Sequence, residues 1–142
     1  MDSSPDTLDL TNLKNAVAAL ERAVKVSTQS EGFDAETCEV IRAGVIQSFA
    51  FTYELCWKFM KRWIEMNTTP AVVEVMFTKK ELFRKSAELN LIIDPVTWFG
   101  FSAARNKTSH TYDGDTANNV AAVAKEFLPY AQDFLARLEQ RL

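Results

Sequence analysis

Histidine, cysteine, glycine and proline are all scarce in this chain of 142 residues, which has one His, two Cys, four Gly and four Pro. So few glycines and prolines argue against a turn-rich β-sandwich or barrel, and the composition favours helices. Cys38 and Cys56 form no CxxC pair, so we expect free thiols in a reducing compartment rather than a disulfide framework. With His110 as the only histidine, the usual histidine-based zinc ligand sets cannot be assembled.

Long apolar runs are also missing. None approaches the ~20 residues that a membrane-spanning helix needs, and the acidic, polar residues 1–6 do not resemble a signal peptide. We therefore expect a cytoplasmic protein that does not contact membranes. A single domain over residues 1–142 is the ordinary organisation for this length. Residues 1–7 precede the first patterned segment, and we expect them to be flexible.

Charge is distributed unevenly along the chain. The net charge of −3 argues against a general nucleic-acid binder. Residues 1–40 carry eight acidic and three basic side chains, whereas residues 42–110 carry ten basic and six acidic ones, an excess of four positive charges. The basic middle is either an ordinary solvated surface or a face for a phosphate-bearing ligand.

Apolar residues recur with helical spacing and predict five helices. These are expected at about residues 8–28, 34–66, 78–89, 94–110 and from 115 to the end. The second has too many apolar residues for one stripe, which indicates either a central position or a subunit interface. We therefore expect an all-α, antiparallel up-and-down four-helix bundle, with residues 70–93 as an insertion that carries one short extra helix.

Capping residues mark the starts of three helices. Asp34 is a suitable N-cap, Thr78 and Glu81 form a capping box, and Asp94 followed by Pro95 is a third start signal.

Two further signals concern helix ends and bends. Gly114 is placed to end the fourth helix in a left-handed conformation. Pro129 lies inside the last helix and predicts a kink near Lys125.

The run from Arg105 to Tyr112 reads Arg-Asn-Lys-Thr-Ser-His-Thr-Tyr. It contains His110, on which the chemistry must rest if the protein is an enzyme. If the helix continues through it, Asn106 and His110 share one face as an i, i+4 pair. Arg105 and His110 then lie about 140° apart at 3.6 residues per turn. They converge only if Arg105 wraps round the helix, the helix distorts, or a ligand lies across a groove between them.

These residue types suit cleavage of a phosphodiester. A helix C-terminus favours the imidazolium form of His110, which can donate a proton to a leaving alkoxide. Arg105 can stabilise the charge of a pentavalent phosphate. That is enough for metal-independent RNA cleavage by the substrate's own 2′-hydroxyl. A lone histidine near a helix end is more often structural or merely exposed, and the spacing Arg-x4-His also arises by chance.

The motif resembles the R-x4-H-x-Y motif of HEPN proteins in its form RN-x-TSHTY. It is most similar to the HEPN partner of minimal nucleotidyltransferases, also called the nucleotidyltransferase substrate-binding protein family. Residues 49–58 resemble the family's signature F-x3-[FY]-E-L-x-W-K. Residues 78–87 resemble a further segment, with Lys79 in place of a common proline.

The resemblance implies a helical-bundle homodimer with two motifs facing each other across a cleft, and a cognate minimal nucleotidyltransferase as partner. In toxin–antitoxin members of the family the HEPN protein is a ribonuclease toxin, which the nucleotidyltransferase silences by AMPylation of the motif's tyrosine. Carried over, Arg105 and His110 are catalytic, Tyr112 is the modified residue, and Asn106 supports the site. No cofactor or metal is implied.

Glu54 has two interpretations. It can form a simple surface pair with Lys58 at i, i+4. Its place in the family signature instead suggests that it supports the site by anchoring Arg105 or a partner residue. Trp57, in the same signature, is expected to be core packing.

The sequence leaves three functions open, each from a different class of protein. The first is an RNA-cleaving HEPN toxin that uses Arg105 and His110. The second is a non-catalytic substrate-binding or regulatory subunit of a minimal nucleotidyltransferase, which suits the negative net charge. The third is a helical bundle without an active site, which would require Arg105 and His110 to be buried in salt bridges.

Overall fold

The computed structural model describes residues 8–76 and 78–142, and within them every regular element is a helix. The helices are α1 (Thr11–Thr28), α2 (Ala35–Asn67), α3 (Pro70–Glu74), α4 (Lys79–Glu88), α5 (Pro95–Asn106), the 3-10 helix η1 (Thr108–His110) and α6 (Gly114–Glu139). The all-α prediction is confirmed. The expected flexibility of residues 1–7 lies outside the described residues. Within those residues, no helix combines the length and apolarity that crossing a membrane requires.

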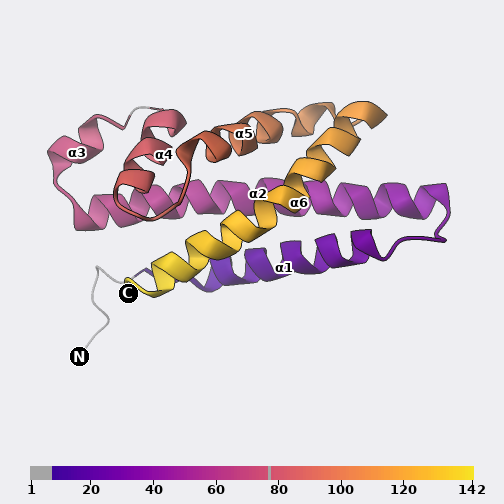
Figure 1. The fold of residues 1–142 in the computed structure, drawn as a ribbon, viewed down its shortest axis with the longest axis horizontal. Coiled ribbons are helices and arrows are strands. Elements are labelled where there is room, and N and C mark those ends of the chain that lie inside the picture. Colours follow the sequence, from indigo (N-terminus) through magenta and orange to yellow (C-terminus); the bar gives the residue numbers. More distant parts are fainter. Residues whose placement is uncertain (1–7, 77) are drawn as a thin grey trace.

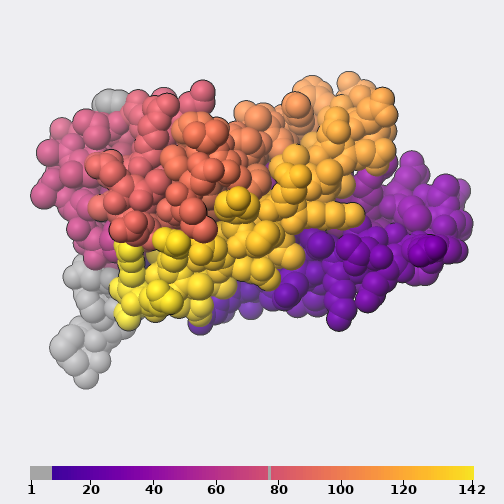
Figure 2. Space-filling view, viewed as in Figure 1, coloured from indigo at the N-terminus to yellow at the C-terminus, as the bar shows by residue number. Residues whose placement is uncertain are grey.

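Four helices run up and down in alternation and form the bundle (Figure 1). α1 and α2 lie side by side and antiparallel, α5 runs along α2, and α6 returns obliquely across α1 and α2. α3 and α4 occupy the end of the molecule near the C-terminus of α2. In the space-filling view (Figure 2), α6 forms a band between α1 and the α4–α5 region.

Local signals explain where most helices begin. The Asp34 carboxylate accepts a hydrogen bond from the backbone N–H of Thr37 at 2.8 Å, and Thr78 Oγ1 accepts one from Glu81 at 3.2 Å. Asp94 caps α5 through the N–H of Val96. These three N-caps are the predicted ones. The additional helix α3 starts at a proline in its first turn, and the sequence patterns did not predict it as a separate element.

α2 is the central helix, which explains its excess of apolar residues. It packs against α1, α6, α4 and α5, so apolar side chains on several faces are buried. Two of its apolar residues remain outside this packing, because Val40 is 72% and Phe51 is 61% exposed.

A cluster of aromatic rings joins α2, α5 and α6 at the centre of the bundle. Phe127 of α6 meets Phe49 of α2 edge-on at a centroid distance of 5.2 Å, and Trp98 and Phe101 of α5 at 5.5 and 5.0 Å. Edge-to-face pairs add about 0.5–1.5 kcal/mol each beyond the area they bury. Phe127 therefore fixes α2, α5 and α6 relative to one another.

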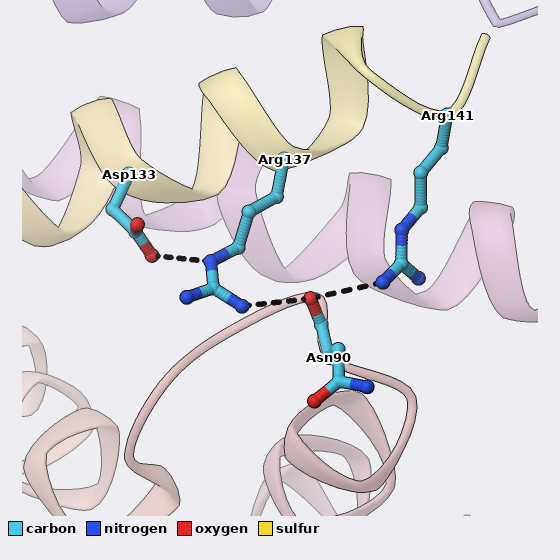
Figure 3. A network of polar contacts seen from close by, with 4 residues as sticks. All are labelled: Asn90, Asp133, Arg137 and Arg141. Atoms are coloured by element: carbon cyan, nitrogen blue, oxygen red, sulfur yellow. Dashed lines mark hydrogen bonds and ion pairs between the residues drawn. The ribbon is translucent and has the colours of Figure 1, made fainter.

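Polar contacts at the C-terminal end of α6 hold the connection between α4 and α5 (Figure 3). Asn90 has φ +62°, a left-handed conformation that asparagine tolerates better than most residues. Its carbonyl accepts hydrogen bonds from Arg137 at 3.0 Å and from Arg141 at 3.2 Å, and Arg137 also pairs with Asp133. These contacts fix the connection that leads into α5 and hence into the motif.

We predict that Phe127→Ala lowers the free energy of unfolding by about 3–5 kcal/mol, because it leaves a cavity where four aromatic side chains meet. Phe51→Ala is the control, since it removes the same ring from a solvent-exposed position of α2 and should change stability by about 0.5 kcal/mol or less. Urea unfolding followed by circular dichroism measures both. Similar losses in the two variants would contradict the assignment of Phe127 to the centre of the core.

Candidate active site

The helix that carries the motif ends earlier than predicted. α5 stops at Asn106, and the chain then turns through the 3-10 helix η1. Gly114 is the first residue of α6 and does not have a positive φ, so the predicted left-handed cap at Gly114 is wrong. The i, i+4 relation of Asn106 and His110 on one α-helical face is wrong for the same reason.

Threonine hydroxyls account for the early end of α5. Thr108 Oγ1 donates to the carbonyl oxygen of Arg105 at 2.8 Å, and Thr111 Oγ1 donates to the carbonyl oxygen of Thr108 at 3.1 Å. Such short-range bonds offer the backbone an alternative to the α-helical pattern. The distortion that could reorient Arg105 and His110 is therefore encoded in the motif itself.

Two neighbours hold the Arg105 side chain. Nη1 donates a hydrogen bond to Thr108 Oγ1 at 2.9 Å, so Thr108 contacts both ends of the same residue. Nε lies 3.4 Å from Glu54 Oε2, as an ion pair without hydrogen-bond geometry, and the Nε atom is buried with no hydrogen-bond acceptor among the described residues. The guanidinium is thus held from two sides, by the Thr108 hydroxyl and by the Glu54 carboxylate.

Glu54 reaches this site from α2. Its carboxylate pairs with Arg105 rather than with Lys58, so the alternative of a simple Glu54–Lys58 surface pair is wrong. The side chains of Arg105 and Glu54 are 36% and 29% exposed, so the pair borders solvent. No spacing rule links Glu54 on α2 to Arg105 on α5, so among the sequence features only the family signature indicated this contact, as one of two interpretations.

His110 and Tyr112 project from the turn that follows α5. Both are exposed, Tyr112 to 88%, and their ring centroids lie 6.4 Å apart in an edge-on arrangement. In the described part of the chain no hydrogen bond or ion pair joins His110 to Arg105 or to Asn106, which is itself exposed. A single chain therefore places these residues on one short segment without closing a site around them.

The nearest buried groups do not supply another acid–base residue. Burial raises the pKa of Tyr53 to about 12. The neighbouring Ser102 lowers that pKa, without a hydrogen bond of good geometry between them, and Glu54 raises it further. Burial also raises the pKa of the Cys56 thiol well above its usual range. At neutral pH both groups stay protonated, so neither acts as a base at this site.

The arrangement can bind an oxyanion and transfer a proton. Arg105 offers a permanent charge on a side chain that borders solvent, and His110 is accessible to a ligand. Burial of both residues in salt bridges, the condition for an inactive bundle, is not met, since only Arg105 is paired and its pair is half-exposed. Thr108 was not predicted as a site residue. The signal that could have identified it is a threonine three residues after an arginine at the end of a helix.

Comparison with known proteins gives one family. The model of the family described as nucleotidyltransferase substrate binding protein like matches residues 8–140. A Haemophilus influenzae protein named probable ribonuclease HepT is 33% identical over 139 residues, which cover 96% of this chain and 95% of that protein.

Two solved structures share the fold. One, from Haemophilus influenzae, is described as the fold of a substrate binding domain of a nucleotidyltransferase. It has a TM-score of 0.86 and 30% identity over 92% of this chain and 99% of that one. The other, from Thermus thermophilus, has a TM-score of 0.67 and 22% identity over 89% of this chain and 98% of that one, and shows the fold alone.

Proposed function

The chain belongs to the nucleotidyltransferase substrate binding protein-like family, and from that premise we propose that it is a HEPN-type, metal-independent endoribonuclease. The observation that carries the proposal is the Arg105 guanidinium, held by Thr108 and Glu54 at the border with solvent, on the same segment as an accessible His110. The relative named probable ribonuclease HepT supports it, with 33% identity over nearly the whole chain.

The chemistry is a transesterification within the RNA. The substrate's 2′-oxygen bonds to phosphorus, its proton leaves to a solvent base, and the bond from phosphorus to the 5′-oxygen breaks. His110 as imidazolium donates a proton to the departing 5′-oxygen. Arg105 stabilises the charge that develops on the phosphate oxygens. The products are a 2′,3′-cyclic phosphate and a free 5′-hydroxyl.

A second copy of the chain completes the site in this proposal. His110 and Tyr112 are exposed on one protomer, and no hydrogen bond or ion pair links His110 to Arg105 within the described residues. One chain alone leaves the site open on one side. A homodimer with two motifs facing a common cleft would surround the substrate. Asn106, also exposed, is then available to orient the imidazole.

The regulatory partner is a cognate minimal nucleotidyltransferase that acts as antitoxin. AMPylation of Tyr112 would place a phosphodiester and a nucleoside beside His110, whose ring lies 6.4 Å away. The added negative charge and bulk would exclude RNA from the site. We place this toxin–antitoxin pair in the cytoplasm, where Cys38 and Cys56 remain free thiols.

The alternative is a non-catalytic substrate-binding or regulatory subunit of a minimal nucleotidyltransferase. The net charge of −3 favours it, as does the description of the Haemophilus influenzae structure as a substrate binding domain. Stable association with a nucleotidyltransferase, combined with no cleavage of RNA by the free protein, would establish this alternative.

The ribonuclease is tested with purified protein, total RNA and excess EDTA. We expect wild type to cleave and His110→Ala to be slower by about 10²–10⁴-fold, the usual effect of losing a general acid. Lys125→Ala, a surface change on α6, is the control and should cleave like wild type. Cleavage that persists unchanged in His110→Ala would refute the mechanism.

Positioning of Arg105 is tested by Glu54→Gln and Thr108→Val, each of which removes one contact of the guanidinium. We expect kcat to fall with KM nearly constant. Thermal stability should change little, because a half-exposed ion pair contributes about 0–1 kcal/mol. Glu139→Gln is the matched control, since it breaks the Lys14–Glu139 pair of the same 3.4 Å length elsewhere on the surface. Equal kcat in Glu54→Gln and Glu139→Gln would show that the Glu54 contact is only structural.

AMPylation is tested by co-expression with the cognate minimal nucleotidyltransferase, followed by peptide mass spectrometry. We expect one adenylyl group on Tyr112, because the chain's other tyrosines, Tyr53 and Tyr130, are buried or half-buried. The modified protein should lose RNA cleavage, and Tyr112→Phe should escape both modification and silencing. An adenylyl group on any other residue would contradict this assignment.

A further inference from the structure

Two half-buried aromatic rings outside the motif each carry two cations. Lys79 Nζ lies 4.7 Å and Lys58 Nζ 5.7 Å from the centroid of Trp57. Cation–π attraction to the ring offsets the repulsion between the two neighbouring like charges. The ring therefore holds both ammonium groups at one place on the surface.

The same arrangement recurs on α5. Lys80 Nζ lies 5.6 Å and Arg84 Cζ 5.4 Å from the centroid of Phe99. Lys79 and Lys80 are adjacent in the first turn of α4, so this one helix places a cation on each ring. The two clusters are linked through the first turn of α4, a helix that packs against both α2 and α5 (Figure 1), and together we call them the basic aromatic surface.

The cations of this surface have no carboxylate partners in the described part of the chain. The ion pairs of those residues are Lys14–Glu139, Lys85–Glu88, Arg105–Glu54 and Arg137–Asp133. Lys58, Lys79, Lys80 and Arg84 are in none of them. Four cations without a direct ion pair are gathered at two rings, an arrangement that favours contact with a polyanion although the net charge of the chain is negative.

The surface is also hollowed beside the first ring. A cavity of about 250 Å³ lies between α2 and α4, lined by Trp57, Lys61, Met76, Thr78, Lys79 and Leu82. Its wall contains an aromatic ring and two lysines. The Nε1 atom of Trp57 is buried and has no hydrogen-bond partner among the described residues.

The basic aromatic surface adjoins the candidate active site. Trp57 follows Glu54 by three residues on α2, within one turn of the carboxylate that holds Arg105. Phe99 precedes Arg105 by six residues on α5, about 9 Å along the helix axis. A chain that occupies the phosphate site at Arg105 can therefore extend directly onto this surface.

We propose that the basic aromatic surface binds single-stranded RNA flanking the scissile phosphate. Bases replace the cations on the rings of Trp57 and Phe99, and the released cations contact the backbone, because base stacking on an aromatic ring is stronger than a cation–π contact at an exposed site. The proposal rests on the ribonuclease function and extends it to substrate selection. Proteins bind single strands by this combination of a positive track and aromatic platforms. An acidic protein partner would use the cations but would give no role to the two rings, so RNA is the occupant we infer.

The test compares two triple variants that lose the same charge. Lys79→Gln with Lys80→Gln and Arg84→Gln removes cations from the surface. Arg22→Gln with Lys25→Gln and Lys125→Gln removes exposed cations of α1 and α6 and is the matched control. Both are made in the His110→Ala background, so that a fluorescent single-stranded oligoribonucleotide stays intact during anisotropy titrations.

We expect the surface variant to bind at least tenfold more weakly at low salt. The slope of log K against log salt should decrease by about 2, since each phosphate contact on a single strand contributes about 0.7. The control should change neither. RNA should also quench tryptophan fluorescence, less so in Trp57→Phe. With His110 restored, the surface variant should show a raised KM and an unchanged kcat.

Equal RNA affinity in the two triple variants would overturn the proposal, provided circular dichroism shows both folded. Loss of nucleotidyltransferase binding with unchanged RNA affinity would overturn it too, and would assign the surface to that protein. A different result would refute the ribonuclease function alone. A wild type that binds RNA through these cations but does not cleave it would refute the nuclease and support the surface.

Discussion

The contact between Phe127 and the rings of α2 and α5 is the constraint on which the rest of the structure depends. It fixes α5 against α2, and that docking brings Arg105, at the end of α5, to Glu54 on α2. Neither residue could find the other through local structure, because 51 positions separate them in the sequence. The polar site is thus a product of the aromatic core.

Within that frame the motif shapes its own backbone. The Thr108 hydroxyl donates a hydrogen bond to the carbonyl oxygen of Arg105 and accepts one from the Arg105 guanidinium. One hydroxyl therefore ends the α-helix and orients the catalytic candidate. As a result α5 ends at Asn106, and His110 and Tyr112 face solvent from the turn that follows it. In the proposed function, this exposure leaves the segment open to an RNA, a second subunit and a modifying enzyme.

Local features of this fold were predictable from the sequence, and features that depend on distant contacts were not. The N-caps at Asp34, Thr78 and Asp94 were predicted because a cap involves residues two or three positions apart. The end of α5 was predicted too late, because glycine is the residue type most common just after a helix. In the structure, the side-chain hydrogen bonds of Thr108 end the helix at Asn106. The resemblance located Arg105 and His110, but only the fold shows that Glu54 pairs with Arg105 rather than with Lys58. The cations over Trp57 and Phe99 depend on how α4 packs, which no periodicity reports.

Charge is separated along the molecule in a way that the net value of −3 conceals. α2 has 33 residues and is about 50 Å long. Acidic residues 31, 34, 36 and 39 surround its N-terminal end, where the helix dipole favours them. The lysines of the basic aromatic surface lie towards its other end. A polyanion that approaches is repelled at one end and attracted at the other, so the field orients it before contact. A negative protein can therefore act on RNA, provided that its positive charges are concentrated beside the phosphate site. Modification of Tyr112 would then add negative charge on the motif itself, close to the part of the field on which binding depends.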